Sequence, residues 1–325
     1  MGLRILKPGI ADSIQDKGRY GYQQLGIPPG GVMDRIAATV ANTLLGNKID
    51  EPVLEMHFPA ATILFESSMM IAITGADFGA EINGHAVLIN QPILVPAKAE
   101  LRFTKNKKGS KVYLSVEEGF QTSSWLGSSS TSFLLHKGGQ EGRNLIKNDL
   151  LEFNNQEDLE IDSLTHLPWR ASMAEFYSDN IIAFMPGAEY QMLEKISQTG
   201  MVTNKFKVST QSNRMGYRLD GQALLLGNKI DCLSSAVSFG TIQLLPNAQM
   251  IVLMADHQTT GGYPRIGHVA SSSLPTLAQV SVGESIQFEL ISRDEAENIY
   301  LQQQQNLQQL QNACNFRLQE YFRNE

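Results

Sequence analysis

Short runs of β-type residues recur along the whole chain, and they constrain its fold more than any other feature. Glycine, proline or asparagine separates these runs, of which the clearest are 61–66, 69–75, 111–119, 181–187, 250–256 and 285–291. Several runs alternate apolar and polar residues and are rich in β-branched residues, which is typical of strands. Regularly spaced short strands favour barrels or sandwiches over a sheet of alternating strands and helices. The chain is therefore predicted to be mainly β.

Helical patterns are few. Residues 34–45 carry apolar side chains at helical spacing, with Asp34 as the expected N-cap and Gly46 just past the end. A second helix is expected over residues 188–196, and a C-terminal helix from Arg293 onward. Despite its glutamine run, the last segment has an apolar stripe, which favours a docked helix over a disordered tail. The stripe consists of Ile299, Leu307, Leu310, Cys314, Leu318 and Tyr321 or Phe322.

An acidic, weakly periodic stretch over residues 154–169 separates two series of strands. Three pairs of similar segments recur in the same order on its two sides, namely 15–22 with 211–217, 44–50 with 225–231, and 75–77 with 254–256. Each pair alone is compatible with chance, but together they favour two related β domains. The predicted ranges are an N-terminal β domain at 1–160, a C-terminal β domain at 161–292 and a helix at 293–325.

Composition excludes several classes of protein. The formal net charge is −7 and no basic block occurs, so a nucleic-acid binder is not expected. Cys232 and Cys314 lack any metal-binding or disulfide spacing, and the histidines show no ligand motif, so no metal site is expected. No apolar run is long enough for a membrane span, and residues 1–16 lack the apolar core of a signal peptide. We therefore expect a cytoplasmic protein.

Residues 15–34 form the densest unusual segment, because they combine five glycines and two adjacent prolines with charged side chains. Glycine permits close approach of the backbone to a ligand. Arg19 offers a rigid fork for a carboxylate or phosphate, and Asp16 would orient it. Gln15 and Asp34 complete the candidate binding residues of this loop. The alternative is a long structural turn with a surface ion pair.

A second polar loop, residues 211–221, follows a predicted strand and contains Gln211, Asn213 and Arg214. These side chains suit recognition of an oxyanion or an amide. The alternative is a β-turn whose side chains are solvated. The candidate roles are a cationic clamp for Arg214 and hydrogen bonding for the two amides.

A third loop, residues 255–267, follows a buried apolar strand. Asp256 stands where that strand opens into the loop, which suits a general base or an orienting group. The paired glycines are expected to form an anion-binding nest, and nearby hydroxyls supply further contacts. A hairpin turn capped by Asp256 is the alternative. The binding candidates here are Thr260, Gly261, Gly262 and Tyr263.

The loop at residues 126–133 is rich in hydroxyl groups, and Ser128, Ser130 and Thr131 are its candidates for holding a phosphate or carboxylate. No GxSxG elbow surrounds a serine, so a nucleophile is not predicted. A solvated polar loop is the alternative. The glycine-rich residues 137–145 are expected to form a turn packed beside a site. No P-loop and no GxGxxG motif occurs.

In their order along the chain, these motifs resemble the family of allophanate hydrolase subunit 2-like, biotin-dependent carboxyltransferase proteins. The standalone bacterial members of that family are the C subunits of 5-oxoprolinases, also described as antagonists of a histidine-kinase inhibitor. The resemblance rests on QDKGRYGY, LGIPPGGVMD, LLGN, ITGAD, GSSST, GGQEGR, QSNRMGYRL, GTIQ and ADHQTTGGYP. The chain departs from the family pattern where Asn213 and Ser273 replace aspartates and Glu118 replaces a glycine.

The resemblance implies two cyclophilin-like, barrel-like β domains with a site in a cleft between them. It also implies an ATP-dependent opening of 5-oxo-L-proline to L-glutamate in a complex with the A and B subunits of such an enzyme, with Mg²⁺ accompanying the ATP. Arg19, Arg214 and Asp256 would be the catalytic residues. No biotin is expected on this chain, which has no carrier-type lysine motif.

Two other functions stay open at this point. One is the carboxyltransferase half of a biotin-dependent carboxylase acting on urea or a similar small amide. The other is a regulatory binding protein that antagonises a histidine-kinase inhibitor. Substrate-dependent ATP hydrolysis separates the first function from both alternatives.

Overall fold

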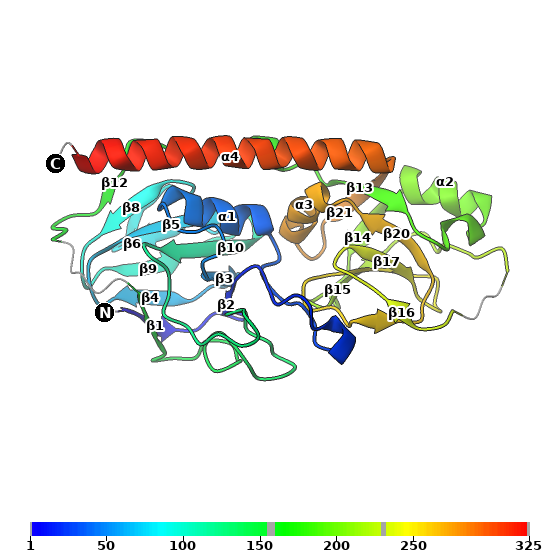
Figure 1. Ribbon diagram of the computed structural model, residues 1–325, viewed down its shortest axis with the longest axis horizontal. Coiled ribbons are helices and arrows are strands. Elements are labelled where there is room, and N and C mark those ends of the chain that lie inside the picture. The colour runs from blue at the N-terminus through cyan, green and yellow to red at the C-terminus, as the bar shows by residue number, and fades with distance from the viewer. Residues whose placement is uncertain (1, 155–159, 229–231, 324–325) are drawn as a thin grey trace. The chain divides into compact units, whose positions relative to one another are not determined.

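The computed structural model describes residues 2–154, 160–228 and 232–323 (Figure 1). They form two compact units, of which the first comprises residues 1–18, 34–173 and 305–325 and the second residues 19–33 and 174–304. The short segment 19–33 thus belongs with the second unit, although it is flanked in sequence by residues of the first. The predicted domain ranges 1–160, 161–292 and 293–325, and the cleft expected between domains, stay predictions.

The first unit contains two six-stranded sheets within the described residues. In one sheet the order is β11 (Leu150–Glu152), β1 (Gly2–Lys7), β4 (Thr62–Phe65), β9 (Glu100–Phe103), β6 (Ala80–Ile82) and β7 (His85–Ala86). In the other it is β12 (Thr165–His166), β8 (Pro92–Val95), β5 (Met69–Asp77), β10 (Lys108–Val116), β3 (Val53–His57) and β2 (Ser13–Gln15).

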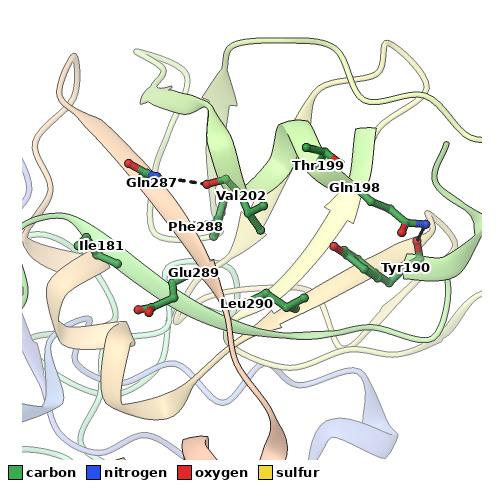
Figure 2. A pocket seen from close by; sticks show the side chains of 9 residues that line it. All are labelled: Ile181, Tyr190, Gln198, Thr199, Val202, Gln287, Phe288, Glu289 and Leu290. Carbon is green, nitrogen blue, oxygen red and sulfur yellow. Dashed lines mark hydrogen bonds between the residues drawn. The ribbon is translucent and has the colours of Figure 1, made fainter. Parts of the chain in front are cut away.

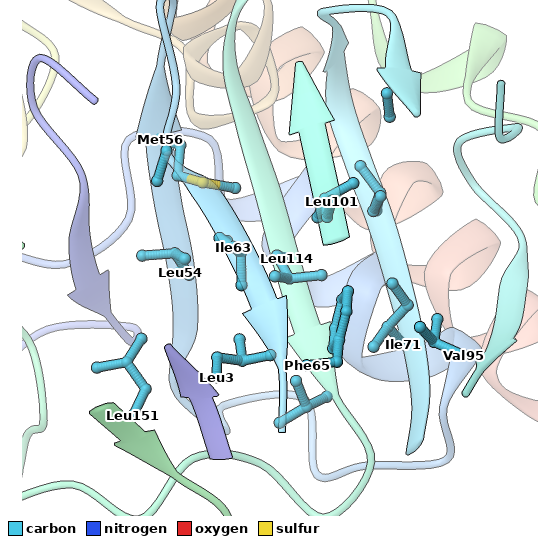
Figure 3. Packing of buried hydrophobic residues seen from close by; sticks show 14 of the residues in the cluster. Leu3, Leu54, Met56, Ile63, Phe65, Ile71, Val95, Leu101, Leu114 and Leu151 are labelled. Carbon is cyan, nitrogen blue, oxygen red and sulfur yellow. The ribbon is translucent and has the colours of Figure 1, made fainter. Parts of the chain in front are cut away.

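The two sheets share one hydrophobic core. Leu3 and Phe65 from one sheet and Ile71 and Leu114 from the other are fully buried in the same cluster, and Figure 3 shows these side chains interleaved. Burial of one such side chain stabilises the fold by roughly 1.5–3 kcal/mol. The alternating pattern of the predicted strands therefore supplies both inner faces of this unit.

Helix α1 (Arg35–Leu44) packs against β5 and β10 (Figure 1). Asp34 is its N-cap, because the Asp34 carboxylate accepts a hydrogen bond from the Ala37 backbone N–H at 3.0 Å. Gly46, just beyond the helix, adopts a positive φ of 71°. The predicted helix at 34–45 is confirmed together with its capping residue.

The second unit is a closed barrel. Its strand order is β13 (Ile181–Pro186), β20 (Arg265–Val269), β17 (Thr241–Leu244), β18 (Met250–Leu253), β15 (Gly216–Asp220), β14 (Lys205–Val208) and β21 (Ser285–Leu290). Parallel pairing of β13 with β21 closes the barrel, while the other neighbours are antiparallel. A separate ribbon joins β16 (Ser235–Ala236) to β19 (Thr260–Gly261). The prediction of a mainly β chain with few helices and a C-terminal helix is confirmed.

Helices α2 (Lys195–Thr203) and α3 (Leu274–Gln279) belong to the barrel unit, together with short 3₁₀ turns that include η3 (Tyr190–Met192). The helix predicted over 188–196 is wrong in its position. Leu193 is extended and bridges Leu226, and the Glu194 N–H donates to the Leu225 carbonyl. Burial of Leu193 in the barrel core selects this extended pairing over local helical propensity.

The long C-terminal helix α4 (Arg293–Arg323) begins at a capping box formed by Ser292 and Glu295, each of which accepts a backbone N–H of the other. The predicted stripe is confirmed from Leu307 to Tyr321, where its members are buried or half-buried. It is wrong at Ile299, which is 46% exposed. Within the described part of the chain, no helix combines the length and apolar content needed to cross a bilayer.

Glu118 has a positive φ of 59°, and the following residue, Gly119, has a φ of 80°. The family pattern of two glycines therefore matches a backbone that side chains with a Cβ rarely adopt. We expect Glu118→Gly to raise the free energy of unfolding by about 0.5–1 kcal/mol, because it relieves this strain. Urea denaturation measures the change. Asn148→Gly, at a φ of 72°, is the control and should gain less, because asparagine tolerates this region; equal or opposite effects would contradict the explanation.

Asp12 is buried before β2 and accepts backbone hydrogen bonds from Gly9 at 2.9 Å and His57 at 3.4 Å. Burial outweighs these bonds and raises the pKa of Asp12 from 3.8 to about 7. The folded chain therefore holds this proton more tightly than the unfolded chain. The associated stabilisation is complete below pH 3.8 and is lost as the pH rises through about 7.

Asp12→Asn should remove this dependence. Relative to the wild type, we expect the variant to gain stability between pH 4 and 8, by on the order of 1–3 kcal/mol. Thermal and urea unfolding across this pH range measures the difference between the two proteins. Two stability curves that run parallel with pH would show that Asp12 does not titrate in this way.

Candidate functional site

In the first unit, the candidate site centres on the carboxylate of Asp16, which directly follows β2. Its Oδ1 accepts hydrogen bonds from the Gly18 N–H at 2.8 Å and from the hydroxyls of Ser128 at 2.6 Å and Ser130 at 2.5 Å. Its Oδ2 accepts from the Ser129 N–H at 2.6 Å. Asp16 is only 8% exposed, so these donors replace the water that a carboxylate otherwise requires.

The hydroxyl-rich loop therefore does hold a carboxylate, and that carboxylate belongs to the chain itself. The predicted ligand-binding hydroxyls of Ser128 and Ser130 both donate to Asp16, more than 110 residues away in sequence. Both oxygens of Asp16 are engaged in this loop. This geometry favours a role for Asp16 in joining two loops over the predicted role of orienting Arg19.

Gln15 and Thr131 continue the same cluster. The Gln15 side-chain amide donates to the Ser13 hydroxyl at 2.9 Å, and the Thr131 hydroxyl donates to the Ile14 carbonyl at 2.9 Å. A Cβ on Gly139 would lie 2.0 Å from the Thr131 hydroxyl oxygen, so only glycine fits there. The turn at residues 137–145 therefore packs beside this cluster, as predicted.

Asp34 belongs to a second buried cluster that the sequence did not reveal. The Asp34 backbone N–H donates to the Tyr113 hydroxyl at 2.8 Å, and that hydroxyl donates to Glu55 at 2.7 Å. Burial, reinforced by the carboxylates of Glu55 and Asp34, raises the pKa of Tyr113 well above its ordinary value, so the phenol stays neutral. The sequence signal was the alternation in β3, where Leu54 and Met56 enter the core and Glu55 takes the opposite face.

In the barrel unit, Arg214 and Asp256 form a bidentate ion pair. The Arg214 Nε lies 2.8 Å from Asp256 Oδ2, and its Nη2 lies 3.1 Å from Oδ1. The backbone sets them side by side, since the ladder between β15 and β18 continues past both strands through the bond from the Asp256 N–H to the Arg214 carbonyl at 2.8 Å. The two side chains are only 12% and 20% exposed, so solvent screens the pair weakly.

Arg214 makes a further hydrogen bond, because its Nη2 donates to the Gly31 carbonyl at 2.6 Å. Arg19 lies in the same unit and is 1% exposed, and its backbone N–H donates to the Pro29 carbonyl at 2.8 Å. The barrel thus brings together Arg214, Asp256 and the segment that carries Arg19. Residues from opposite halves of the sequence meet here.

Asn213 shapes the turn that presents Arg214. Its side-chain oxygen accepts from the Met215 N–H at 2.8 Å, and its backbone exchanges two hydrogen bonds with Gly216. Because an oxygen is the required group, asparagine can replace the aspartate of the family pattern here. Ser273 retains an acceptor in the same way, since its hydroxyl accepts from the Ala183 N–H at 3.1 Å. Gln211 is exposed on this loop.

The loop at residues 255–267 differs from the prediction in one respect. Gly261 lies in β19, and neither Gly261 nor Gly262 is among the glycines with positive φ, which an anion-binding nest requires. A Cβ on Gly261 would lie 2.7 Å from the amide nitrogen of Gln243, so close packing explains the glycine instead. Thr260 and Tyr263 are both exposed.

His257, beside Asp256, is buried, and its ring Nδ1 lies 2.5 Å from the Gln258 carbonyl. Burial lowers the pKa of His257 below its ordinary value, so the ring is neutral and Nδ1 donates to that carbonyl. This matches the interpretation of the histidines as surface or satisfied core residues. Across the described ranges, no group of His, Cys, Asp and Glu side chains is arranged to hold a metal ion.

A cavity of about 590 Å³ opens elsewhere on the barrel unit, between residues of β13, β21 and α2 (Figure 2). Its walls include Tyr190, Val202, Phe288 and Glu289. The predicted site residues are not among those that line it. The cavity is therefore separate from the clusters around Asp16 and Arg214.

The sequence of this chain identifies its family. Residues 25–290 match the family model of the carboxyltransferase domain, subdomain A and B. The chain therefore belongs to this carboxyltransferase family, as its motifs predicted.

Two bacterial relatives match nearly end to end. The chain is 36% identical over 285 residues to the 5-oxoprolinase C subunit of Haemophilus influenzae, covering 87% of this chain and 89% of that protein. It is 35% identical over 310 residues to the 5-oxoprolinase C subunit of Escherichia coli, covering 95% and 97%. The resemblance to such proteins therefore extends over their whole length.

Solved structures show the same fold within larger enzymes. The urea amidolyase of K. lactis superimposes with a TM-score of 0.87 at 27% identity, covering 95% of this chain but 20% of that one. The urea carboxylase of Kluyveromyces lactis gives 0.87 at 26% identity, covering 95% and 29%. This chain corresponds to one part of those much longer enzymes.

Removal of the Asp16 carboxylate tests the first cluster. Asp16→Ala leaves two hydroxyls and two backbone N–H groups without their acceptor, so we expect the free energy of unfolding to fall by about 2–4 kcal/mol. Urea denaturation measures the change. The control is Asp50→Ala, which breaks an exposed ion pair of 2.6 Å with Lys17 and should cost less than about 1 kcal/mol. Equal losses in both variants would contradict the central place of Asp16.

Proposed function

We propose that this chain is the C-type component of an ATP-dependent 5-oxoprolinase, which opens 5-oxo-L-proline to L-glutamate together with the A and B subunits of that enzyme. The observation that carries the proposal is the similarity to two proteins named as C subunits of 5-oxoprolinase, at 36% and 35% identity over 89% and 97% of their lengths. The urea enzymes match with lower identity and over a small part of their length.

Opening the lactam is difficult because amide resonance makes its carbonyl a poor electrophile. ATP would supply the driving force by phosphoryl transfer. In this chain the hydroxyls of Ser128 and Ser130 are used by Asp16, and the charge of Arg214 is balanced by Asp256. These groups are a poor fit for a triphosphate, so we assign ATP and its Mg²⁺ to a partner within the complex.

The barrel-unit cluster is the part of this chain that we assign to the lactam. Of the two roles expected for Asp256, orientation fits better than proton abstraction, because both carboxylate oxygens accept from the Arg214 guanidinium. The exposed side chains of Gln211, Thr260 and Tyr263 belong to the same two loops and are available to a small polar substrate. Arg19 would act from the neighbouring segment on an anionic group.

A second candidate is the carboxyltransferase half of a biotin-dependent carboxylase acting on urea or a related amide. The family model and the TM-score of 0.87 with urea carboxylase favour this candidate. In that case the biotin would be carried by another chain or domain. The two candidates differ in whether the product is ring-opened glutamate or a carboxylated amide.

Reconstitution distinguishes them. The chain is co-purified with a partner of the B type, combined with a partner of the A type, and assayed for ATP hydrolysis and for glutamate formation from 5-oxo-L-proline. We expect hydrolysis that depends on 5-oxo-L-proline and requires this chain. Carboxylation of urea with a biotinylated carrier, without glutamate formation, would favour the second candidate and overturn the first.

Within that complex, Asp256→Ala should lower kcat/KM for 5-oxo-L-proline by roughly 100-fold or more, since Arg214 loses the carboxylate that orients it. Co-elution with both partners and an unchanged circular dichroism spectrum establish that the variant is folded. Glu189→Ala is the matched control, because it removes the carboxylate partner of Arg265 in the same barrel. Full turnover by Asp256→Ala would exclude a role for this carboxylate.

A further inference from the structure

The segment of residues 19–33, which we call the strap, is held in the barrel unit by groups at both of its ends. Its first residue, Arg19, is buried, and its last, Met33, lies in the hydrophobic core of the barrel. The bond from the Arg19 N–H to the Pro29 carbonyl closes the strap into a loop. Its tip is open to solvent, since Tyr20 is 49% and Leu25 69% exposed.

One side chain of the barrel reaches the strap backbone. Arg214 Nη2 donates to the Gly31 carbonyl at 2.6 Å, where Gly30 and Gly31 adopt positive φ values of 67° and 97°. Such a backbone has no strand or helix ladder to fix it. A charge-assisted bond to its carbonyl is therefore well placed to select this conformation.

Asp256 fixes the direction of that bond. Its two carboxylate oxygens grip Nε and Nη2 of Arg214 at 2.8 and 3.1 Å. A fork held at two points has little rotational freedom, so the same Nη2 is aimed at Gly31. With a side chain that is 12% exposed and a carboxylate opposite, Arg214 offers little charge to a soluble anion.

We propose that Arg214 is a positioning residue that fastens the strap to the barrel, with Asp256 as its orienting partner, and that it is not a clamp on an anionic substrate. The strap carries Arg19 and the glycine-proline loop. The fastening therefore determines where these groups stand. It is a property of the free chain and does not depend on the proposed function.

The flanks of the strap are fixed independently inside the first unit. The Gly18 N–H donates to the Asp16 carboxylate at 2.8 Å, and the Asp34 N–H donates to the Tyr113 hydroxyl at 2.8 Å. These two bonds hold the residues before and after the strap. Arg214 supplies the bond that acts on the strap itself.

Limited proteolysis of the free full-length chain tests the proposal. Chymotrypsin cleaves after Tyr20, Tyr22 and Leu25, so its rate in the strap reports local opening. Arg214→Ala should raise cleavage in the strap by about tenfold or more. Arg265→Ala is the matched control, because it removes a similar ion pair, with Glu189 at 3.0 Å, from the same barrel; it should leave strap cleavage at the wild-type rate.

Chemical rescue separates positioning from a general loss of stability. Methylguanidinium at millimolar concentration should restore protection of the strap in Arg214→Ala and should not affect the control. If Arg214→Ala fails to fold, Arg214→Lys and Asp256→Asn take its place, and we expect cleavage rates between wild type and the open strap. Their melting temperatures should stay close to the wild type.

Wild-type cleavage of the strap in all three Arg214 and Asp256 variants would overturn the proposal. So would faster cleavage that methylguanidinium does not reverse. In the assembled enzyme, a raised KM for an anionic substrate with an intact strap would identify Arg214 as a ligand clamp instead. Absence of 5-oxoprolinase activity in the wild-type complex would overturn the proposed function and leave the fastening of the strap intact.

Discussion

The candidate site of the first unit depends on one buried carboxylate, that of Asp16. A carboxylate removed from water is costly unless donors surround it, and here two hydroxyls and two backbone N–H groups do so. Two of these donors are more than 110 residues distant in sequence. The loop after β2 and the hydroxyl-rich loop must therefore reach their final conformation together, and the turn containing Gly139 can pack only once Thr131 is in place.

The barrel unit meets a comparable requirement with a different donor. Asp256 is satisfied by the guanidinium of Arg214, which then has one N–H for the Gly31 carbonyl. In both units, an aspartate beside the end of a strand converts a flexible glycine-rich loop into a fixed one. Glycine supplies the backbone conformations, and the carboxylate selects one of them.

This organisation bears on how a chain of this family contributes to catalysis. The polar groups that look like phosphate ligands in the sequence are largely engaged with one another, and what faces solvent are amide and hydroxyl side chains on two loops of the barrel. A protein of this kind positions loops and binds a small polar substrate. The proposal that ATP is bound by a partner follows from this distribution of engaged and available groups.

Features that depend on neighbouring residues could be predicted from the sequence without a structure. Alternation predicted the strands, Asp34 and the apolar spacing predicted α1, and the stripe from Leu307 predicted most of α4. The motifs predicted the family. The folded chain was needed to show that Ser128 and Ser130 serve Asp16, that Glu55 and Tyr113 stand under Asp34, and that Leu193 is extended. Periodicity sets which face a side chain takes, whereas its partner is set by sheet register and barrel closure across 40 to more than 100 residues.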